Sequence, residues 1–427
     1  MRTVKGLSLA LLLGALAPPW HSSAAEPARL SKADLGERFL LQVNYFEHDN
    51  GLRNFTTSRS RIVRFEREGA ALRMLDDPDA DAAASGPQLL ATIPIRSETE
   101  ASLEVDLNAG FDEIYLEEDR TGEDYYGRVD KRDHRSFQLL DRKVLSISCD
   151  EPLLVFDQEA KNEDGERIVV HYYLSRYRPD PGFRPFEMNS LKHFGFYETY
   201  AQRRSGQWVQ YAMKFSADAP IVFALSSSIP ARYRDAVRDG VLYWNRALGK
   251  PLLRAIDAPP GVQAPSPDYN VVEWITSGDY ASTSYIQSDP LTGQILHAHV
   301  FVLRETMMDG DLEQQNDHLR YIVAHEIGHA LGLRHNFAPA HATTVMDYFN
   351  LMQILQVGRD IGAGKGALPY DREVIRHVYL GEPLDVNALP PFCTDGQRGC
   401  SPFPSTPPRE SVGIKGCAPA DESAPPD

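Results

Sequence analysis

Cysteine is scarce in this chain, which has four cysteines among 427 residues and no pair spaced as CxxC. The missing CxxC pair argues against a cysteine-bound metal cluster, and in an exported protein it favours disulfides. Cys393 and Cys400 are the natural pair for a disulfide. Cys149 and Cys417 lie far apart in the sequence, so they form either a long-range bridge or two free thiols.

Hydrophobic runs long enough to cross a membrane are also missing. The apolar run at residues 7–17 follows Arg2 and Lys5 and precedes a stretch of small residues that ends at Ala25. This run is too short to span a bilayer, so we expect no integral membrane association. The pattern is typical of a cleavable secretory signal over residues 1–25, which predicts a secreted or periplasmic protein.

Positive charge is in deficit, because 44 Lys and Arg residues face 60 Asp and Glu residues and leave a formal net charge of −16. An acidic chain is repelled by phosphate backbones, so no nucleic-acid partner is expected.

The length predicts two or three domains. The oligomeric state stays open.

Two patterns divide the chain behind the signal segment. Residues 26–200 contain short alternating or β-branched runs separated by turn residues, which predicts a β-rich N-terminal domain. Residues 201–392 combine strands with helices, and residues 393–427 form a tail rich in Cys and Pro. The fold class expected from this order is α+β.

Within residues 201–392 the hydrophobic pattern predicts six elements. Pro230 and Gly249 bracket one helix, because proline suits the first turn of a helix and glycine its end. The strands are expected at residues 221–225, 270–275 and 295–303, and two further helices at about 317–333 and 371–379.

The longer of these last two helices carries the chemistry. His325 and His329 are four residues apart, so both imidazoles lie on one helical face and can reach one metal ion. Glu326 can address a water bound to that ion, and Gly332 permits a left-handed turn that brings His335 to the same ion. Three neutral imidazoles leave a tetrahedral Zn²⁺ with one open position, which indicates catalysis rather than a structural site.

With Met346 downstream, the chain resembles the metzincin zinc endopeptidases, which combine the pattern HExxHxxGxxH with a methionine-containing turn beneath the metal. Tyr348 matches a position at which some branches carry a tyrosine that ligates zinc or stabilises the oxyanion. Further stretches resemble bacterial secreted or periplasmic zinc metalloproteases that have a β-rich N-terminal domain. The resemblance implies a mixed twisted sheet with an active-site helix and C-terminal helices, and a protein or peptide substrate.

The resemblance also implies roles for particular residues. Glu326 is expected to be the general base, and Tyr348 is expected to donate to the oxyanion. Gly332 and Met346 are expected to form the supporting turns. The strand that contains His299, Val300 and Phe301 is expected to be the edge strand that aligns an extended peptide.

Three alternatives remain beside this interpretation. The histidines could be packed in a helix core without a metal. A thermolysin-like enzyme would share HExxH but take its third ligand from a downstream Glu. A non-catalytic or latent zinc-binding protein would use its N-terminal domain for protein recognition; latency through Cys149 is disfavoured, because its surroundings read as a strand end. His297 and His299 are interpreted as surface histidines.

Overall fold

The structure is a computed structural model. It describes residues 28–49, 52–57, 60–77, 88–115, 136–150, 153–162, 165–188, 193–202, 208–276, 282–304, 309–337, 343–389 and 392–394. The predicted signal segment, Cys400 and Cys417 lie outside these residues.

The N-terminal part is a ten-stranded antiparallel sheet with the order β1-β7-β6-β5-β4-β2-β12-β11-β10 and with β3 paired to β2. Its strands are β1 (Ala28–Ser31), β2 (Arg38–Asp49), β3 (Leu52–Thr57), β4 (Arg61–Glu68), β5 (Ala71–Asp76), β6 (Gln88–Glu98), β7 (Ser102–Val105), β10 (Leu140–Asp150), β11 (Leu153–Lys161) and β12 (Arg167–Arg176). The short elements η1 (Lys32–Asp34), α1 (Leu107–Gly110), β8 (Glu113–Tyr115) and β9 (Ser136–Gln138) accompany it. This confirms a β-rich N-terminal part of an α+β chain.

One face of this sheet encloses a hydrophobic core. Alternation along each strand turns the apolar residues to that face, because side chains of successive residues point to opposite sides. Phe156 stacks on Tyr172 at a centroid distance of 4.3 Å, and Phe111 packs edge-on against both rings. All three are buried. The N-terminal sheet therefore has a core of its own.

The C-terminal part is built on a five-stranded sheet with the order β16-β15-β17-β19-β18. Its strands are β15 (Ile221–Leu225), β16 (Leu253–Asp257), β17 (Asn270–Ile275), β18 (Thr283–Ser288) and β19 (Ile295–Leu303). All pairs are parallel except that of β18 with β19. The three predicted strands are confirmed at their predicted bounds, whereas β16 and β18 were not predicted.

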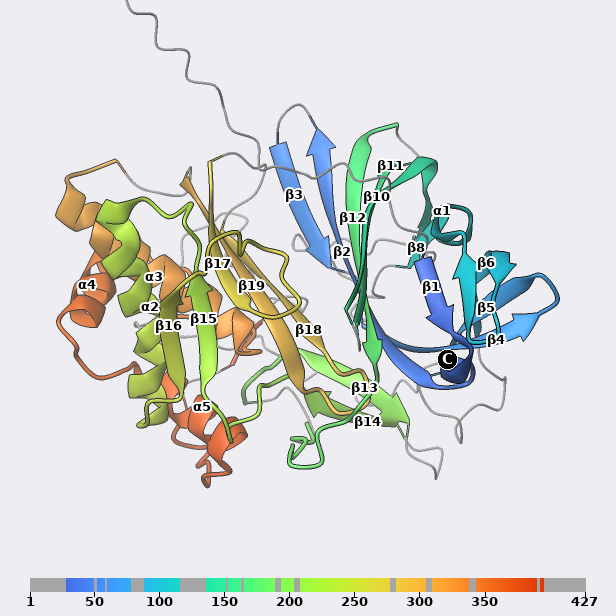
Figure 1. Cartoon of the computed structure of the whole chain (residues 1–427). Helices are drawn as coiled ribbons and strands as arrows, with labels where there is room; N and C mark the ends of the chain where they lie inside the picture. The colour runs from blue at the N-terminus through green and yellow to red at the C-terminus, as the bar shows by residue number, and fades with distance from the viewer. Residues whose placement is uncertain are drawn as a thin grey trace, which may run out of the picture.

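Four helices gather on the side of this sheet that faces away from the N-terminal sheet (Figure 1). They are α2 (Arg234–Leu248, preceded by η2, Ala231–Tyr233), α3 (Leu312–Ala330), α4 (Leu351–Gly362) and α5 (Pro369–Leu380). The predicted stop of α2 is confirmed, because Gly249 has φ of 71° and caps the helix. Helix α3 begins five residues earlier than predicted, behind a capping box formed by Asp311 and Gln314.

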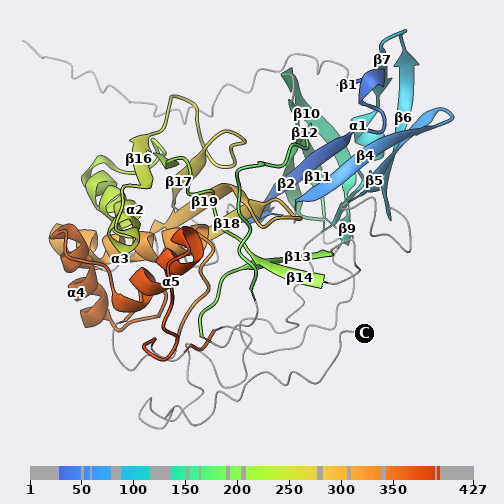
Figure 2. The same ribbon diagram turned by 90° about the horizontal axis from the view of Figure 1, so that it is seen from below.

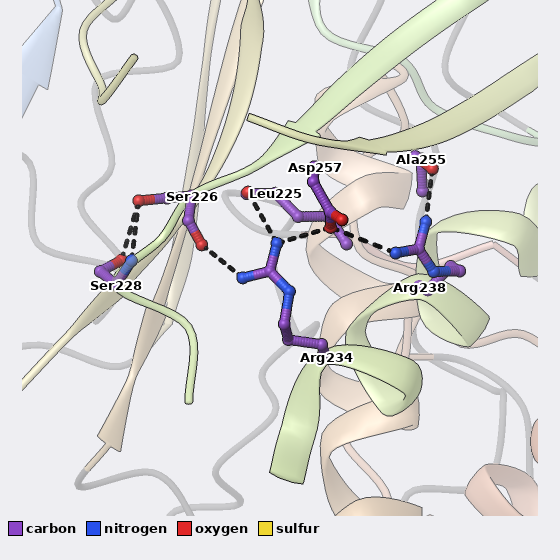
Figure 3. Close-up of polar contacts among 7 residues, drawn as sticks. All are labelled: Leu225, Ser226, Ser228, Arg234, Arg238, Ala255 and Asp257. Atoms are coloured by element: carbon purple, nitrogen blue, oxygen red, sulfur yellow. Dashed lines mark hydrogen bonds and ion pairs between the residues drawn. The ribbon is translucent and has the colours of Figure 1, made fainter. Parts of the chain in front are cut away.

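Two arginines tie the start of α2 to the sheet (Figure 3). Arg234 donates to the carbonyls of Leu225 and Ser226 and pairs with Asp257 at 2.7 Å. Arg238 reaches the same carboxylate and the carbonyl of Ala255. These contacts fix α2 against the ends of β15 and β16, and α2 in turn carries Trp244 to the helix that holds the histidines.

The strand predicted to align substrate is not an edge strand. Strand β19, with His299, Val300 and Phe301, pairs with β17 on one side and with β18 on the other. Its backbone donors and acceptors are therefore used within the sheet, and it cannot accept a peptide by strand addition. The edge on this side of the sheet is β18.

The hairpin of β13 (Glu198–Gln202) and β14 (Trp208–Ala212) lies between the helices and the N-terminal sheet (Figure 2). The segment before it belongs with the second core, because Met188 and Phe196 are buried among residues of the C-terminal part. The first core includes residues only up to Leu174. The chain therefore passes from the first core to the second between Leu174 and Met188, before the domain boundary predicted at residue 200.

Candidate metal centre

Helix α3 and the loop after it bring three histidines together. The Nε2 atoms of His325, His329 and His335 lie 3.0, 3.1 and 3.3 Å from one another. All three side chains are buried, and they form the one group of three or more potential ligands found among the described residues. The predicted ligand set is therefore brought to one point.

Hydrogen bonds at Nδ1 hold the rings of two of these histidines in orientations that direct their Nε2 atoms toward the common centre. Nδ1 of His325 donates to the carbonyl of Val345 at 2.6 Å, and Nδ1 of His329 donates to the carbonyl of Leu333 at 2.8 Å. A proton on Nδ1 leaves Nε2 with a free lone pair in the neutral ring. Carbonyl acceptors behind ligand imidazoles are the usual support for a bound metal.

The spacing of the three nitrogens suits zinc. Tetrahedral coordination with Zn–N bonds of about 2.0–2.1 Å places two imidazole nitrogens about 3.4 Å apart. Burial and the two neighbouring imidazoles hold the pKa of His329 well below its usual range, which keeps this ring neutral. Neutral nitrogen donors converging in a buried position are what a zinc ion requires.

The helix stops so that His335 can turn back. Gly332 has φ of 97°, its N–H donates to the His329 carbonyl, and the N–H of Leu333 donates to the Gly328 carbonyl. This pair of bonds is a Schellman motif, which favours glycine at the left-handed position. A Cβ at Gly332 would also lie 2.0 Å from the carbonyl oxygen of Met213. The predicted role of Gly332 is confirmed on both counts.

Met346 lies directly beneath the metal helix. Its side chain is fully buried, and a Cβ added at Gly328 would lie 2.2 Å from its sulfur. The Met346 carbonyl accepts from the N–H of Asn336, which links this turn to the residue after His335. Trp244 of α2 donates to the carbonyl of Ala324 from the same side. The predicted supporting turn is therefore in place.

Asp371 holds this turn from below and was not predicted as part of the site. Its carboxylate is fully buried and accepts from the hydroxyls of Thr344 and Tyr243, each at 2.5 Å, and from the N–H of Val345 at 3.0 Å. Burial raises the pKa of Asp371 to about 6. Because the Val345 carbonyl orients His325, Asp371 is connected to a ligand through a single residue, Val345. Its position in the first turn of α5 was visible in the sequence, but its partners were not.

Glu326 and Tyr348 lie beside the histidine cluster. Glu326 is 6% exposed, and burial raises the pKa of its carboxyl group to about 8. The ring of Tyr348 is partly buried and lies 4.9 Å from the ring of His335 and 5.5 Å from that of His325, measured between centroids. Tyr348 thus adjoins the centre as predicted, and Glu326 neighbours it through His325, the residue before it on α3.

Other predicted residues lie elsewhere. His299 is 1% exposed and sits in the interior strand β19, and burial lowers its pKa to about 3 and that of His297 to about 4. The interpretation of His299 as a surface histidine was wrong, because residues around 266 cover this ring: the N–H of Ser266 reaches Nε2 of His299 at 3.4 Å, whereas His297 is only partly buried. Val300 and Phe301 are buried beside them.

The cysteines are resolved only in part. Cys149 is an exposed free thiol, which favours the second of the two alternatives for it. Cys393 is buried near His335, where its carbonyl accepts from the N–H of Phe337. Its predicted partner Cys400 is outside the described residues, so that disulfide stays a prediction.

No helix in the described part of the chain is both long and apolar enough to cross a membrane.

Comparison with known proteins gives one informative match. Residues 308–383 match the family model described as Met-zincin. A search of curated proteins found no match. The crystal structure of the ywiB protein from Bacillus subtilis aligns at 11% identity over 33% of this chain and 93% of that chain, with a TM-score of 0.14, which is too low to bear on the fold.

The family match covers the metal helix, the third ligand, the methionine turn, α4 and α5. It agrees with the buried histidine triad in pointing to zinc as the cofactor. Residues 308–383 thus match the Met-zincin family, and His325, His329 and His335 are the candidate zinc ligands within them.

Proposed function

We propose that this protein is an exported zinc-dependent endopeptidase that hydrolyses peptide bonds. The observation that carries the proposal is the convergence of three imidazole nitrogens within the segment that matches the Met-zincin family, in which Glu326 directly follows His325 on α3. Three protein ligands are typical of catalytic rather than structural zinc. Zinc, when bound, supplies a Lewis acid that polarises the scissile carbonyl and acidifies water.

The residues of this chain then divide the remaining work. Glu326 follows His325 directly on α3, so its carboxylate can accept a proton from the attacking water and return it to the leaving amine. Tyr348 packs against the rings of His325 and His335, from where its hydroxyl can donate to the developing oxyanion. The buried surroundings strengthen both interactions by excluding water.

Strand β18 replaces β19 as the element that aligns substrate. It is the edge strand nearest in sequence to the metal helix and packs against α3. An extended peptide would lie along the side of β18 away from β19 and add by backbone pairing, as in other strand-addition complexes. The resulting arrangement of sheet, active-site helix and methionine turn is metzincin-like.

Hydrolysis of casein by purified residues 26–427, with zinc analysis, tests this function beside the Glu326→Ala variant. We expect the wild type to cleave, and the variant to keep its zinc and lose about 100-fold or more in rate, because only the general base is removed. Zinc binding without cleavage by either protein would favour a latent or non-catalytic zinc-binding protein. Equal rates for both proteins would refute the role of Glu326.

A further inference from the structure

The loop that carries the third ligand is paired with a segment nearly 140 residues earlier in the chain. Phe196 and Leu333 form an antiparallel bridge. The N–H of Tyr197 donates to the Gly332 carbonyl at 2.7 Å, and the N–H of Arg334 donates to the Gly195 carbonyl at 3.0 Å. The turn between His329 and His335 is thus held by backbone pairing from outside the metal helix.

The side chain of Arg334 reinforces this pairing. Its Nε donates to the carbonyl of Phe196 at 3.0 Å, and its Nη2 lies 3.2 Å from a carboxylate oxygen of Glu198. Its guanidinium also covers the ring of Tyr197 at 5.3 Å from the centroid. The side chains of Glu198 and Arg334 are only 5% and 17% exposed. Removing one partner of an ion pair this shielded strongly destabilises the protein, because the other charge is left buried without compensation.

These contacts reach two of the ligands: His335 through the backbone next to it, and His329 through Nδ1, the ring nitrogen that is not part of the cluster of Nε2 atoms. Arg334 is bonded directly to His335 in the chain, so fixing its side chain limits how the His335 backbone can rotate. The Tyr197 hydroxyl lies 3.4 Å from Nδ1 of His329, and the two ring centroids are 6.0 Å apart. The segment therefore contacts the ligand loop through its backbone and His329 through Nδ1.

We propose that Glu198, Arg334 and Tyr197 form a ligand latch that positions His335 and His329 and sets how tightly zinc is retained. These are positioning residues, because the contacts described above reach the backbone of the ligand loop and Nδ1 of His329, not an Nε2 atom. The inference rests on zinc binding by the triad and is independent of peptide hydrolysis. It also makes the segment ahead of β13 an essential part of the metal centre.

The test is the zinc dissociation constant of the full chain, measured by competition with a chromophoric chelator. In Glu198→Gln we expect the dissociation constant to rise tenfold or more, as is usual when a residue behind a metal ligand is lost. Amide hydrogen exchange at Leu333–His335 should accelerate in the same variant, because Arg334 loses its charged partner. Tyr197→Phe removes a single hydroxyl, and chelators should strip its zinc measurably faster than that of the wild type.

The matched control is Asp34→Asn, which breaks a shielded pair with Arg176 in the N-terminal sheet. Its zinc dissociation constant should equal that of the wild type. A folded Glu198→Gln protein with a lowered unfolding temperature but a zinc dissociation constant within twofold of wild type would show a merely structural pair and overturn the latch. If Glu198→Gln does not fold, unchanged zinc loss in Tyr197→Phe overturns it. Failure of the wild type itself to bind zinc would instead refute the metal centre.

Discussion

Lys214 is a buried cation in the C-terminal part of the molecule. It is 6% exposed, and its ammonium lies 4.6 Å from the ring centroid of Phe183 and 5.7 Å from that of Tyr379. Aromatic faces attract the charge, but they do not replace its lost hydration. Burial accordingly lowers the pKa of Lys214 to about 8.

This lowered pKa predicts a pH dependence of stability. Between pH 8 and the unfolded pKa of about 10.4, the unfolded state binds more protons at Lys214 than the folded state does, so this residue makes the protein more stable as pH rises. The free energy of unfolding of the wild type minus that of Lys214→Met should therefore increase from pH 8 to pH 10. Urea denaturation at several pH values measures this difference.

A difference for Lys214→Met that stays flat between pH 8 and pH 10 would contradict the assignment of a depressed pKa to this lysine.

At the residue scale, the metal ligands and the turns at Gly332 and Met346 were predictable, whereas the supporting carboxylates of Asp371 and Glu198 were not. His325, His329 and Gly332 follow from spacing along one helix and its stop, which are local properties of the chain. Asp371 and Glu198 act on partners that are 26 and 136 residues away in the sequence. A single sequence records no such contacts, so these residues can be found only once the chain is folded.

At the scale of elements, strand β18 is the strand that we propose aligns the substrate. Its backbone groups on the side away from β19 have no strand partner in the five-stranded sheet. Strand β16 forms the opposite edge of this sheet. Strands β15, β17 and β19 separate it from β18, the edge strand that packs against α3. The two edges thus form a natural comparison.

Binding of an unlabelled casein-derived peptide to the Glu326→Ala protein should slow amide exchange in β18 (Thr283–Ser288). A peptide added as a new strand protects the edge amides with which it pairs. Exchange in β16 (Leu253–Asp257) should be unchanged, which makes that strand the internal control. Equal protection of both edges, or of neither, would contradict strand addition at β18.

Elements were predicted well where apolar residues recur regularly. Strands β15, β17 and β19 have long apolar or β-branched runs, whereas β18 reads Thr-Ser-Tyr-Ile-Gln-Ser and gives little signal. Helix α4 was missed, although Asn350 and Gln353 form a capping box that the sequence displays. The wrong assignment of the edge had a different cause, because hydrophobic pattern identifies a strand and not its neighbours.

At the scale of the whole molecule, two separate cores meet through polar contacts. Tyr177 donates to the carboxylate of Asp289 at 3.0 Å, and Gln42 donates to Gln287 at 3.4 Å. The Tyr173 hydroxyl reaches the carbonyl of Pro265 at 3.4 Å. Polar contacts of this kind are typical of interfaces between domains rather than of domain cores. The sequence predicted a β-rich part followed by a mixed part, but not which surfaces join them.

We infer that three imidazoles of this chain hold one zinc ion and leave a position for chemistry. X-ray absorption at the zinc edge of the purified full chain measures the ligands directly. We expect one zinc per chain with three imidazole nitrogens at about 2.0–2.1 Å, one further light-atom ligand and no sulfur at about 2.3 Å. A chain without stoichiometric zinc, or zinc with a cysteine sulfur in its coordination sphere, would contradict this inference.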